Sequence, residues 1–357
     1  MTTVDNQRVT KLMGEARVDF DAERGNSRAG LVEPPTHSGV FPSAFVEREL
    51  VEEGVVVTGI CGRLGKLLTR ELHRTTKVIG IDRRPFPDRP RDVVHHEIDL
   101  RRSRTKDVFR GGRIRALVHL GVMHDPHVSP RERHQWNVVS FQKLLDYAVQ
   151  FRVPKVIVLS GAGVYGAHPA NPQFLSEDAP LLGAQEDGRT RDLVEMDMLA
   201  QSHFWRYPEA ETVILRPCNV VGTVRNAASN YLRLARPVTL LGYDPMVQII
   251  DERDVVRAIE LALRPGVRGI FNLRGQGELP LSRLLERAGK KPLPLPTSAL
   301  RVATDSLFQA RLSGFSKGQL DFLRFPCMVD DRRAKQELGF SPRYTLDETL
   351  ARLHLEG

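Results

Sequence analysis

The segment Val55-Val56-Val57-Thr58-Gly59-Ile60-Cys61-Gly62-Arg63-Leu64-Gly65 decides the fold of this chain. Its three valines are apolar and β-branched, so they predict a buried strand. The glycines then follow at TGxxGxxG spacing, and leucines recur at helical intervals from Leu64 to Leu72. Gly59 allows the tight turn, Gly62 lets backbone N–H groups approach a pyrophosphate, and Gly65 lets the helix pack on the strand. We therefore predict a dinucleotide site, with Thr58, Arg63 and Leu64 as further members.

A second apolar strand, residues 77–82, ends in an acid that bears on the choice of cofactor. Asp82 comes 23 residues after Gly59. A carboxylate at that point binds the adenosine ribose hydroxyls and repels a 2′-phosphate, which favours NAD. Arg83 and Arg84 argue for NADP instead, because guanidinium groups bind that phosphate. Asp99, which follows a short third strand, is expected near the adenine.

Strands and helices alternate along the middle of the chain. Further apolar runs predict strands at residues 95–99, 116–120, 156–160 and 212–215, with helices at 64–72, 137–151 and 193–204. This alternation predicts an α/β fold of the Rossmann type, a doubly wound parallel sheet. After Arg216 the pattern is less regular, and a Pro-rich stretch (291–296) and a helix (347–355) suggest a smaller mixed C-terminal lobe. We expect a flexible tail at 1–50, a dinucleotide-binding domain at 51–222, and a substrate lobe at 223–357 from which 247–275 return to the first domain.

The charge of the chain favours a small anionic partner. The 357 residues carry a formal net charge of +8; residues 1–50 hold six basic and eight acidic residues, so the remainder is +10. Between Asp82 and Arg115 eleven Lys or Arg meet six Asp or Glu. No helix-turn-helix, zinc-finger or RNP-type pattern accompanies this excess, so we expect a phosphorylated small molecule and not a nucleic acid.

Other sequence features bear on the compartment. No apolar run approaches the roughly 20 residues that span a bilayer, and the N-terminus lacks the apolar core of a signal peptide, so we expect no membrane association. Cys61, Cys218 and Cys327 lie far apart without a CxxC pair. We therefore expect no metal site and no disulfide framework, in keeping with a reducing cytoplasm.

From Val55 to Leu353 the chain resembles the extended short-chain dehydrogenase/reductase family, also called the NAD-dependent epimerase/dehydratase family. The resemblance rests on segments that occur in the family's order: TGxxGxxG at Thr58, Asp82, Asp99-Leu100, Val118-His119-Leu120-Gly121, Asn137-Val138, Ser160 to Gly166, Leu215 to Gly222, Gln248 to Ala258, Gly269 to Leu273 and Leu338 to Arg343. Within that family the chain is most similar to a bacterial branch described as UDP-glucose 4-epimerase-like.

The resemblance implies a cofactor domain and a lobe that encloses a nucleotide-sugar or a related hydroxylated substrate. It implies that the cofactor contacts Asp82, Asp99, Leu100, Leu120, Gly121, Asn137 and Pro217. It implies that Asn219 faces the substrate, and Arg233 or Arg236 is a candidate for a substrate diphosphate by location. It also implies a homodimer formed by the helices that contain Leu144 and Leu199.

The family's catalytic residues are missing from their expected positions. The family uses a tyrosine and a lysine spaced YxxxK on one helix, with a nearby Ser or Thr. Here the corresponding region reads Asp187-Gly188-Arg189-Thr190-Arg191-Asp192, and Gly161 takes the Ser/Thr position. The nearest available groups are Ser160, Tyr165, Arg189 and Arg191, and an arginine stays protonated and cannot act as an ordinary base.

Three explanations of this departure stay open. Tyr165 replaces the missing tyrosine, or it only packs beneath the sheet edge. His124 or His168, each on a loop after a strand, carries the proton, or each is merely solvated. Alternatively, the protein binds a dinucleotide without the redox reaction and serves as a regulatory or scaffold protein.

Overall fold

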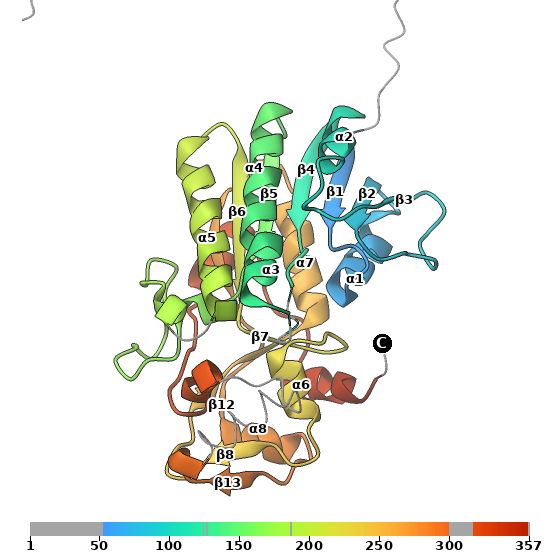
Figure 1. Cartoon of the computed structure of the whole chain (residues 1–357). Helices are drawn as coiled ribbons and strands as arrows, with labels where there is room; N and C mark the ends of the chain where they lie inside the picture. The colour runs from blue at the N-terminus through green and yellow to red at the C-terminus, as the bar shows by residue number, and fades with distance from the viewer. Residues whose placement is uncertain (1–52, 124, 126–127, 186–187, 300–316, 356–357) are drawn as a thin grey trace, which may run out of the picture. The chain divides into compact units, whose positions relative to one another are not determined.

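The computed structural model describes residues 53–123, 125, 128–185, 188–299 and 317–355. The expected tail at 1–50 lies outside these residues. Seven strands form one parallel sheet in the order β11-β6-β5-β4-β1-β2-β3 (Figure 1). These strands are β1 (Gly54–Thr58), β2 (Lys77–Asp82), β3 (Val94–Glu97), β4 (Ile114–His119), β5 (Lys155–Leu159), β6 (Glu211–Pro217) and β11 (Gly269–Leu273). The predicted Rossmann-type α/β class is confirmed.

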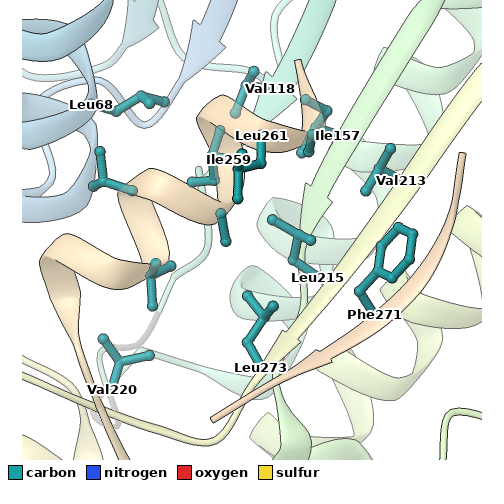
Figure 2. Packing of buried hydrophobic residues seen from close by; sticks show 14 of the residues in the cluster. Leu68, Val118, Ile157, Val213, Leu215, Val220, Ile259, Leu261, Phe271 and Leu273 are labelled. Carbon is teal, nitrogen blue, oxygen red and sulfur yellow. The ribbon is translucent and has the colours of Figure 1, made fainter. Parts of the chain in front are cut away.

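Helices cover both faces of the sheet. They are α1 (Arg63–Leu72), α2 (Thr105–Arg110), α3 (Pro130–His134), α4 (Ser140–Gln150), α5 (Gly188–Arg206) and α7 (Glu252–Ala262). One core cluster joins the sheet to α1 and α7, and a second joins the opposite face to α2, α4 and α5. Figure 2 shows the first cluster, where Ile259 and Leu261 of α7 lie over Ile157 and Leu215 of the sheet. Because both faces are covered, the strands are nearly uninterrupted apolar runs.

The helix expected at residues 137–151 is divided in the structure. A π-helical turn, Gln135–Val139, lies between α3 and α4. Within it Asn137 is buried and its side chain bonds both backbone groups of Met123, accepting from N at 2.7 Å and donating to O at 3.3 Å. The turn therefore fixes the segment that follows β4, next to the place where the strand order reverses. Such turns are frequently found at functional sites.

A mixed lobe follows the sixth strand. Its elements are β7 (Asn219–Val221), α6 (Ala227–Arg233), β8 (Val238–Leu240), β9 (Met246–Val247), β10 (Ile249–Asp251), β12 (Leu279–Pro280), α8 (Leu281–Arg287), β13 (Leu293–Leu295), the 3-10 helix η4 (Lys317–Leu323) and α10 (Leu346–Ala351). The short strands pair as β10–β7, β12–β9 and β13–β8. The Pro-rich stretch supplies β13, which pairs only with β8. Pro294 has no N–H to donate, and a strand in such a two-stranded pairing tolerates it because few backbone donors are needed. Between these elements the chain returns to the sheet as α7 and β11.

Candidate functional site

The glycine loop has the geometry that a pyrophosphate needs. Gly59 adopts φ +72°, and a Cβ there would lie 2.7 Å from the Cα of Gly121. A Cβ on Gly65 would lie 2.7 Å from the Cα of Ile60, so only glycine allows α1 to approach β1 this closely. Gly62 precedes the first turn of α1 in an extended conformation and has no side chain to cap it. The N-terminus of α1 therefore opens toward a ligand with unobstructed backbone donors.

A cavity of about 860 Å³ begins at this loop and continues into the lobe. The expected cofactor residues that line it are Gly59, Gly62, Arg63, Leu64, Gly65, Asp82, Arg83, Leu100, Leu120, Gly121 and Pro217. The expected substrate residue Asn219 lines it as well. The cavity lies at the carboxyl ends of β1 and β4, between which the strand order reverses, and this is where doubly wound sheets bind ligands.

Asp82 is buried and already engaged by protein donors. Its carboxylate accepts from the backbone N of Cys61 at 3.1 Å and from the side chain of Arg84 at 3.1 and 3.0 Å. The backbone N of Arg84 donates to it as well, at 3.0 Å. This pairing raises the pKa of the Arg84 guanidinium, and burial raises the pKa of the Cys61 thiol to about 11. The thiol is therefore neutral and fills space in the loop.

A tryptophan that the sequence analysis did not single out lies at the same end of the cavity. The guanidinium groups of Arg83 and Arg101 lie 4.9 and 5.3 Å from the ring centre of Trp136, and the Nε1 of this tryptophan donates to the carbonyl of Gly121 at 3.1 Å. Arg101 in turn binds Asp99 at 2.6 Å. Burial raises the pKa of Asp99, but the hydrogen bonds from Arg101 outweigh it and hold that pKa below its usual range.

Three of the residues expected to contact the cofactor do not line the cavity and instead bond to residues around it. Thr58 is buried, and its Oγ1 lies 2.7 Å from Nδ1 of His119. Asp99 is held by Arg101. Asn137 holds the loop after β4 through Met123, as described above. Each of these side chains holds a neighbouring segment in place, and it is the residues of those segments that line the cavity.

The expected catalytic residues separate into different places. Ser160 lines the cavity where β5 ends, and its Oγ donates to Oδ2 of Asp197 at 2.6 Å. Tyr165 is fully buried outside the cavity lining; its hydroxyl donates to Asn272 at 2.7 Å and accepts from Arg216 at 2.8 Å. Burial raises the pKa of Tyr165 to about 12. This geometry corrects the idea that Tyr165 replaces the missing tyrosine, because its hydroxyl has no access to a ligand in the cavity.

The two histidines considered as proton carriers and the two arginines of the same region lie away from the cavity or outside the part of the chain that the structure describes. His124 lies outside the described residues, as does the side chain of Arg189. His168 is exposed and does not line the cavity. Arg191 is exposed and its Nε donates to the carbonyl of Ala184.

Asp197 is the buried acid that the sequence analysis missed. It is fully buried and forms a bidentate ion pair with Arg216, whose Nε and Nη2 donate to its two carboxylate oxygens at 2.9 and 2.7 Å. The same carboxylate also accepts from the hydroxyl of Ser160. Arg216 continues through Tyr165 to Asn272 of β11. A polar chain thus runs from the cavity through α5 to the outermost strand.

Arg233, expected at a substrate diphosphate, lies outside the main cavity. Its guanidinium donates to the carbonyls of Gly222 and, at 2.9 Å, Val224. It lines a separate hollow together with Arg63 and Arg225. Burial, with repulsion from Arg225 and Arg63, lowers the pKa of Arg233. Its place argues against direct contact with a substrate in the main cavity, and Arg236 is exposed and lines neither space.

Comparison with known proteins identifies the family. Residues 55–273 match the family model described as "NAD dependent epimerase/dehydratase family", so the chain belongs to this family of NAD-dependent enzymes and NAD is its cofactor. Uncharacterized proteins of Mycobacterium tuberculosis and Mycobacterium bovis are 29% identical over 311 residues, which is 82% of this chain and 81% of theirs. The expected family is confirmed.

Solved structures confirm the fold. A UDP-glucose 4-epimerase from Thermotoga maritima, crystallised with UDP-glucose, superposes with a TM-score of 0.67 at 20% identity, covering 84% of this chain and 97% of that one. A dTDP-glucose 4,6-dehydratase from Bacillus anthracis, in complex with NAD, gives 0.64 at 17% identity, covering 84% and 95%. No helix within the described ranges is long and apolar enough to cross a membrane.

Proposed function

We propose that the chain is an NAD-dependent, epimerase/dehydratase-like oxidoreductase that acts on a nucleotide-sugar or a related hydroxylated substrate by an atypical proton transfer. The observation that carries the proposal is the continuity of the cavity, which joins the glycine loop to the lobe past Pro217 and Asn219. NAD supplies hydride acceptance when bound. The close packing around Gly59 and Gly65 and the open N-terminus of α1 fit its pyrophosphate.

Ser160 is the group we propose to meet the substrate hydroxyl. Its Oγ lies at the carboxyl end of β5 and is oriented by the 2.6 Å bond to Asp197. In this arrangement Oγ accepts the hydrogen of the substrate hydroxyl and Asp197 receives the proton of the serine. Asp197 is itself fixed by Arg216, which keeps the pair in one geometry. Positioned acid–base groups contribute about 10²–10⁴ in rate, so the loss of Ser160 is expected to lower turnover on that scale.

The test combines binding and turnover on the full-length protein. Native mass spectrometry reports any retained dinucleotide, and absorbance at 340 nm reports NAD reduction with a panel of sugars, UDP-glucose and other alcohols. We expect Ser160→Ala to bind NAD as before and to lose about 100-fold or more in turnover. Ser176→Ala, at an exposed serine outside the cavity lining, is the matched control. Absence of NAD binding refutes the proposal, and full activity of Ser160→Ala refutes the role of Ser160.

One observation favours a second candidate, a dinucleotide-binding protein without turnover. Among the described residues that line the cavity there is no histidine or lysine, and the hydroxyl of the one lining tyrosine, Tyr231, donates to the carbonyl of Val238. Tight NAD binding with neither NAD reduction nor formation of an epimer across the substrate panel supports this alternative. The partner expected in that case binds the basic surface after β2.

The nucleotide-sugar expected from the resemblance is one member of the proposed substrate class. UDP-glucose, present in the Thermotoga maritima structure, therefore belongs in the panel. A cytoplasmic location stays an expectation from cysteine usage alone.

The dimer implied by the resemblance would use α4 and α5. These helices pack side by side on one face of the sheet (Figure 1), and Val149 and Met198 are exposed on them. We expect native mass spectrometry to show a dimer that Met198→Glu dissociates, with Leu241→Glu as the control at an exposed apolar residue of the lobe. A monomer at micromolar concentration contradicts it.

A further inference from the structure

A second, smaller hollow lies beside the main cavity and is surrounded by positive side chains. Its volume is about 530 Å³, and sites for small molecules measure roughly 300–1,000 Å³. We define the basic hollow by the four cations that line it, which are Arg63, Arg225, Arg233 and Lys290. None of the described residues in its lining is an Asp or a Glu. The lining therefore carries four positive charges.

The four cations come from segments that are far apart in the sequence. Arg63 is the first residue of α1, and Arg225 lies in the segment between β7 and α6. Arg233 is the last residue of α6, and Lys290 comes three residues after the end of α8. Folding thus brings like charges together, although repulsion between them opposes this arrangement.

Three of the cations have no partner within the described part of the chain. Arg63, Arg225 and Lys290 form neither an ion pair nor a hydrogen bond there. Arg63 and Lys290 are nevertheless half-buried, so solvent screens their charges only in part. By contrast, the half-buried Arg274 pairs with Asp331 at 3.1 Å. The basic hollow therefore offers hydrogen-bond donors and positive charge that the fold itself does not use.

The fourth cation, Arg233, is held by two backbone carbonyls, as described above. Burial is the largest cause of its lowered pKa, and repulsion from Arg225 and Arg63 adds to it. The carboxylate of Glu252 opposes this shift, but it is buried and paired with Arg352 at 2.7 Å. An anion among these side chains would relieve the repulsion, so the electrostatics of the basic hollow favour a bound anion.

The number of charges indicates which kind of anion fits best. A single phosphate group carries roughly two negative charges at neutral pH, which is about half of what four cations balance. Linked phosphates carry more charge and present oxygens in several directions. Arginine and lysine are the side chains that bind such oxygens, through short charge-assisted hydrogen bonds.

We propose that the basic hollow binds a small molecule with two or more linked phosphates, at a site separate from that of the substrate. Arg233 and Lys290 line the hollow and do not line the main cavity. Ser160, Pro217 and Asn219 line the main cavity and do not line the hollow. This binding site is additional to the proposed function and does not depend on turnover.

Two of the four cations connect the basic hollow to the cofactor. Arg63 directly follows Gly62 of the glycine loop, and both Arg63 and Arg225 line the main cavity as well. A phosphate in the hollow and the pyrophosphate of NAD therefore attract the same guanidinium groups, and the two anions repel each other. Each ligand should weaken the other by the same factor, so a phosphorylated compound would regulate NAD binding through this site.

The experiment measures the binding of phosphate, pyrophosphate and tripolyphosphate to the NAD-saturated full chain by calorimetry. Ionic strength is held constant, because salt screens exposed cations. We expect the dissociation constant to fall with each added phosphate, by about tenfold or more from phosphate to tripolyphosphate. Equal constants for the three anions, or no binding of tripolyphosphate at about millimolar concentration, overturn the proposal.

A pair of neighbouring lysines locates the binding. Lys290→Gln removes a cation that lines the basic hollow alone, and it should weaken tripolyphosphate about tenfold or more and leave NAD affinity unchanged. Lys291→Gln is the matched control, because Lys291 is exposed and lines neither space. Parent affinity for tripolyphosphate in Lys290→Gln overturns the proposal. If this variant fails to fold, Arg225→Gln, at an exposed side chain, decides in its place.

UDP-glucose distinguishes a separate ligand from the diphosphate of a substrate. With a separate site, UDP-glucose has no effect on tripolyphosphate affinity or lowers it only to a plateau. A loss that continues to grow with UDP-glucose concentration shows competition for one site and overturns the proposal.

The chain's own acidic residues are tested in the same way. Glu356 follows the lining residue Leu355 in the sequence and lies outside the described residues. Tripolyphosphate binding by Glu356→Gln and not by the parent chain would show that this carboxylate occupies the hollow, and it would overturn the proposal.

The connection to the cofactor has its own measurement. Saturating tripolyphosphate should raise the dissociation constant of NAD about fivefold and then have no further effect, because both ligands bind together. An unchanged constant overturns the regulation of NAD binding. Absence of NAD binding overturns the proposed function, whereas tripolyphosphate binding that depends on Lys290 would still support the basic hollow.

Discussion

We expect the preference for NAD over NADP to depend on the carboxylate of Asp82, for which the side chain of Arg84 and the adenosine ribose of the cofactor compete. Asp82 accepts three hydrogen bonds from Arg84 and one from the loop, and it lines the cavity where the adenosine ribose is expected. We predict that Asp82→Asn reverses or nearly removes the preference for NAD over NADP. The amide has the shape of the carboxylate without its charge. Its oxygen can keep the bond from the N of Cys61, which holds the loop, but its NH₂ group cannot accept from the N and Nε of Arg84 and therefore releases that side chain.

The expected change in the ratio of the NAD and NADP dissociation constants follows from two contributions. A hydrogen bond to a charged group contributes roughly 1.5–3 kcal/mol, against roughly 1 for a neutral one, so NAD loses about tenfold in affinity. A carboxylate about 5 Å from a 2′-phosphate repels it by roughly 3 kcal/mol at an effective dielectric constant near 20, and the solvated mouth of the site reduces this to about tenfold. Release of Arg84 adds a partner for the phosphate. We expect the ratio of the two dissociation constants to change by about 100-fold.

Trp136 provides the assay. It lines the cavity beside Arg83, whereas Trp205 is 74% exposed and does not line it, so quenching of tryptophan fluorescence on titration reports the site. Asp88→Asn is the matched control, because Asp88 is an exposed acid paired with Lys66 outside the cavity lining. An unchanged NAD to NADP ratio in Asp82→Asn would show that the carboxylate does not meet the ribose and would refute this reasoning.

Three further predictions concern the loop, the buried ion pair and the pH dependence. Gly62→Val should weaken dinucleotide binding by about 100-fold or more, because the side chain would occupy the space that a pyrophosphate needs at the N-terminus of α1. Its Cβ would lie 3.1 Å from the carbonyl oxygen of Gly59, so we expect a small fall in melting temperature as well; retained affinity in a titration contradicts this prediction. Asp197→Ala should cost about 3–5 kcal/mol in urea unfolding, because it leaves the guanidinium of Arg216 buried without a carboxylate; a loss below about 1 kcal/mol would argue against the pair. Burial lowers the pKa of His119 to about 3, so the unfolded chain binds the proton first, and stability complete above pH 6.5 should fall by up to about 2 kcal/mol at pH 5. His119→Gln should flatten this pH slope, and a slope equal to that of the parent protein speaks against the assignment.

Much of the sheet could be predicted because each strand, turn and helix is specified by residues that are next to one another in the sequence. The valines of β1 and the glycines that follow specify strand, turn and helix within eleven residues, and the structure shows that order. The division of the helix at 135–139 could not be predicted, because it depends on Asn137 bonding a backbone that lies fourteen positions earlier. Propensity alone favours one continuous helix there.

The site was harder to predict than the fold because its residues come from segments that lie far apart in the sequence and are brought together only by folding. Ser160 was a candidate by position, but its partner Asp197 lies 37 residues further on a helix where no motif marks it. The part of the cavity lining that the lobe supplies is harder still to predict, since Met246, Leu284 and Phe322 each have the character of ordinary core residues in the sequence. Only the fold shows that they face one cavity.

The position of β11 has a consequence for biosynthesis and for recombination. The outermost strand, Gly269–Leu273, pairs with β6 only after the chain has passed through β7, α6 and the strands of the lobe. A nascent chain therefore leaves the ribosome with β6 as an unpaired, apolar edge until residue 273 has emerged, and such edges recruit other strands. The lobe is thus built from two stretches of the chain, one between β6 and α7 and one after β11, and strands of the two stretches pair with each other. A chimera that exchanges lobes between relatives must therefore replace both stretches and keep α7 and β11 between them.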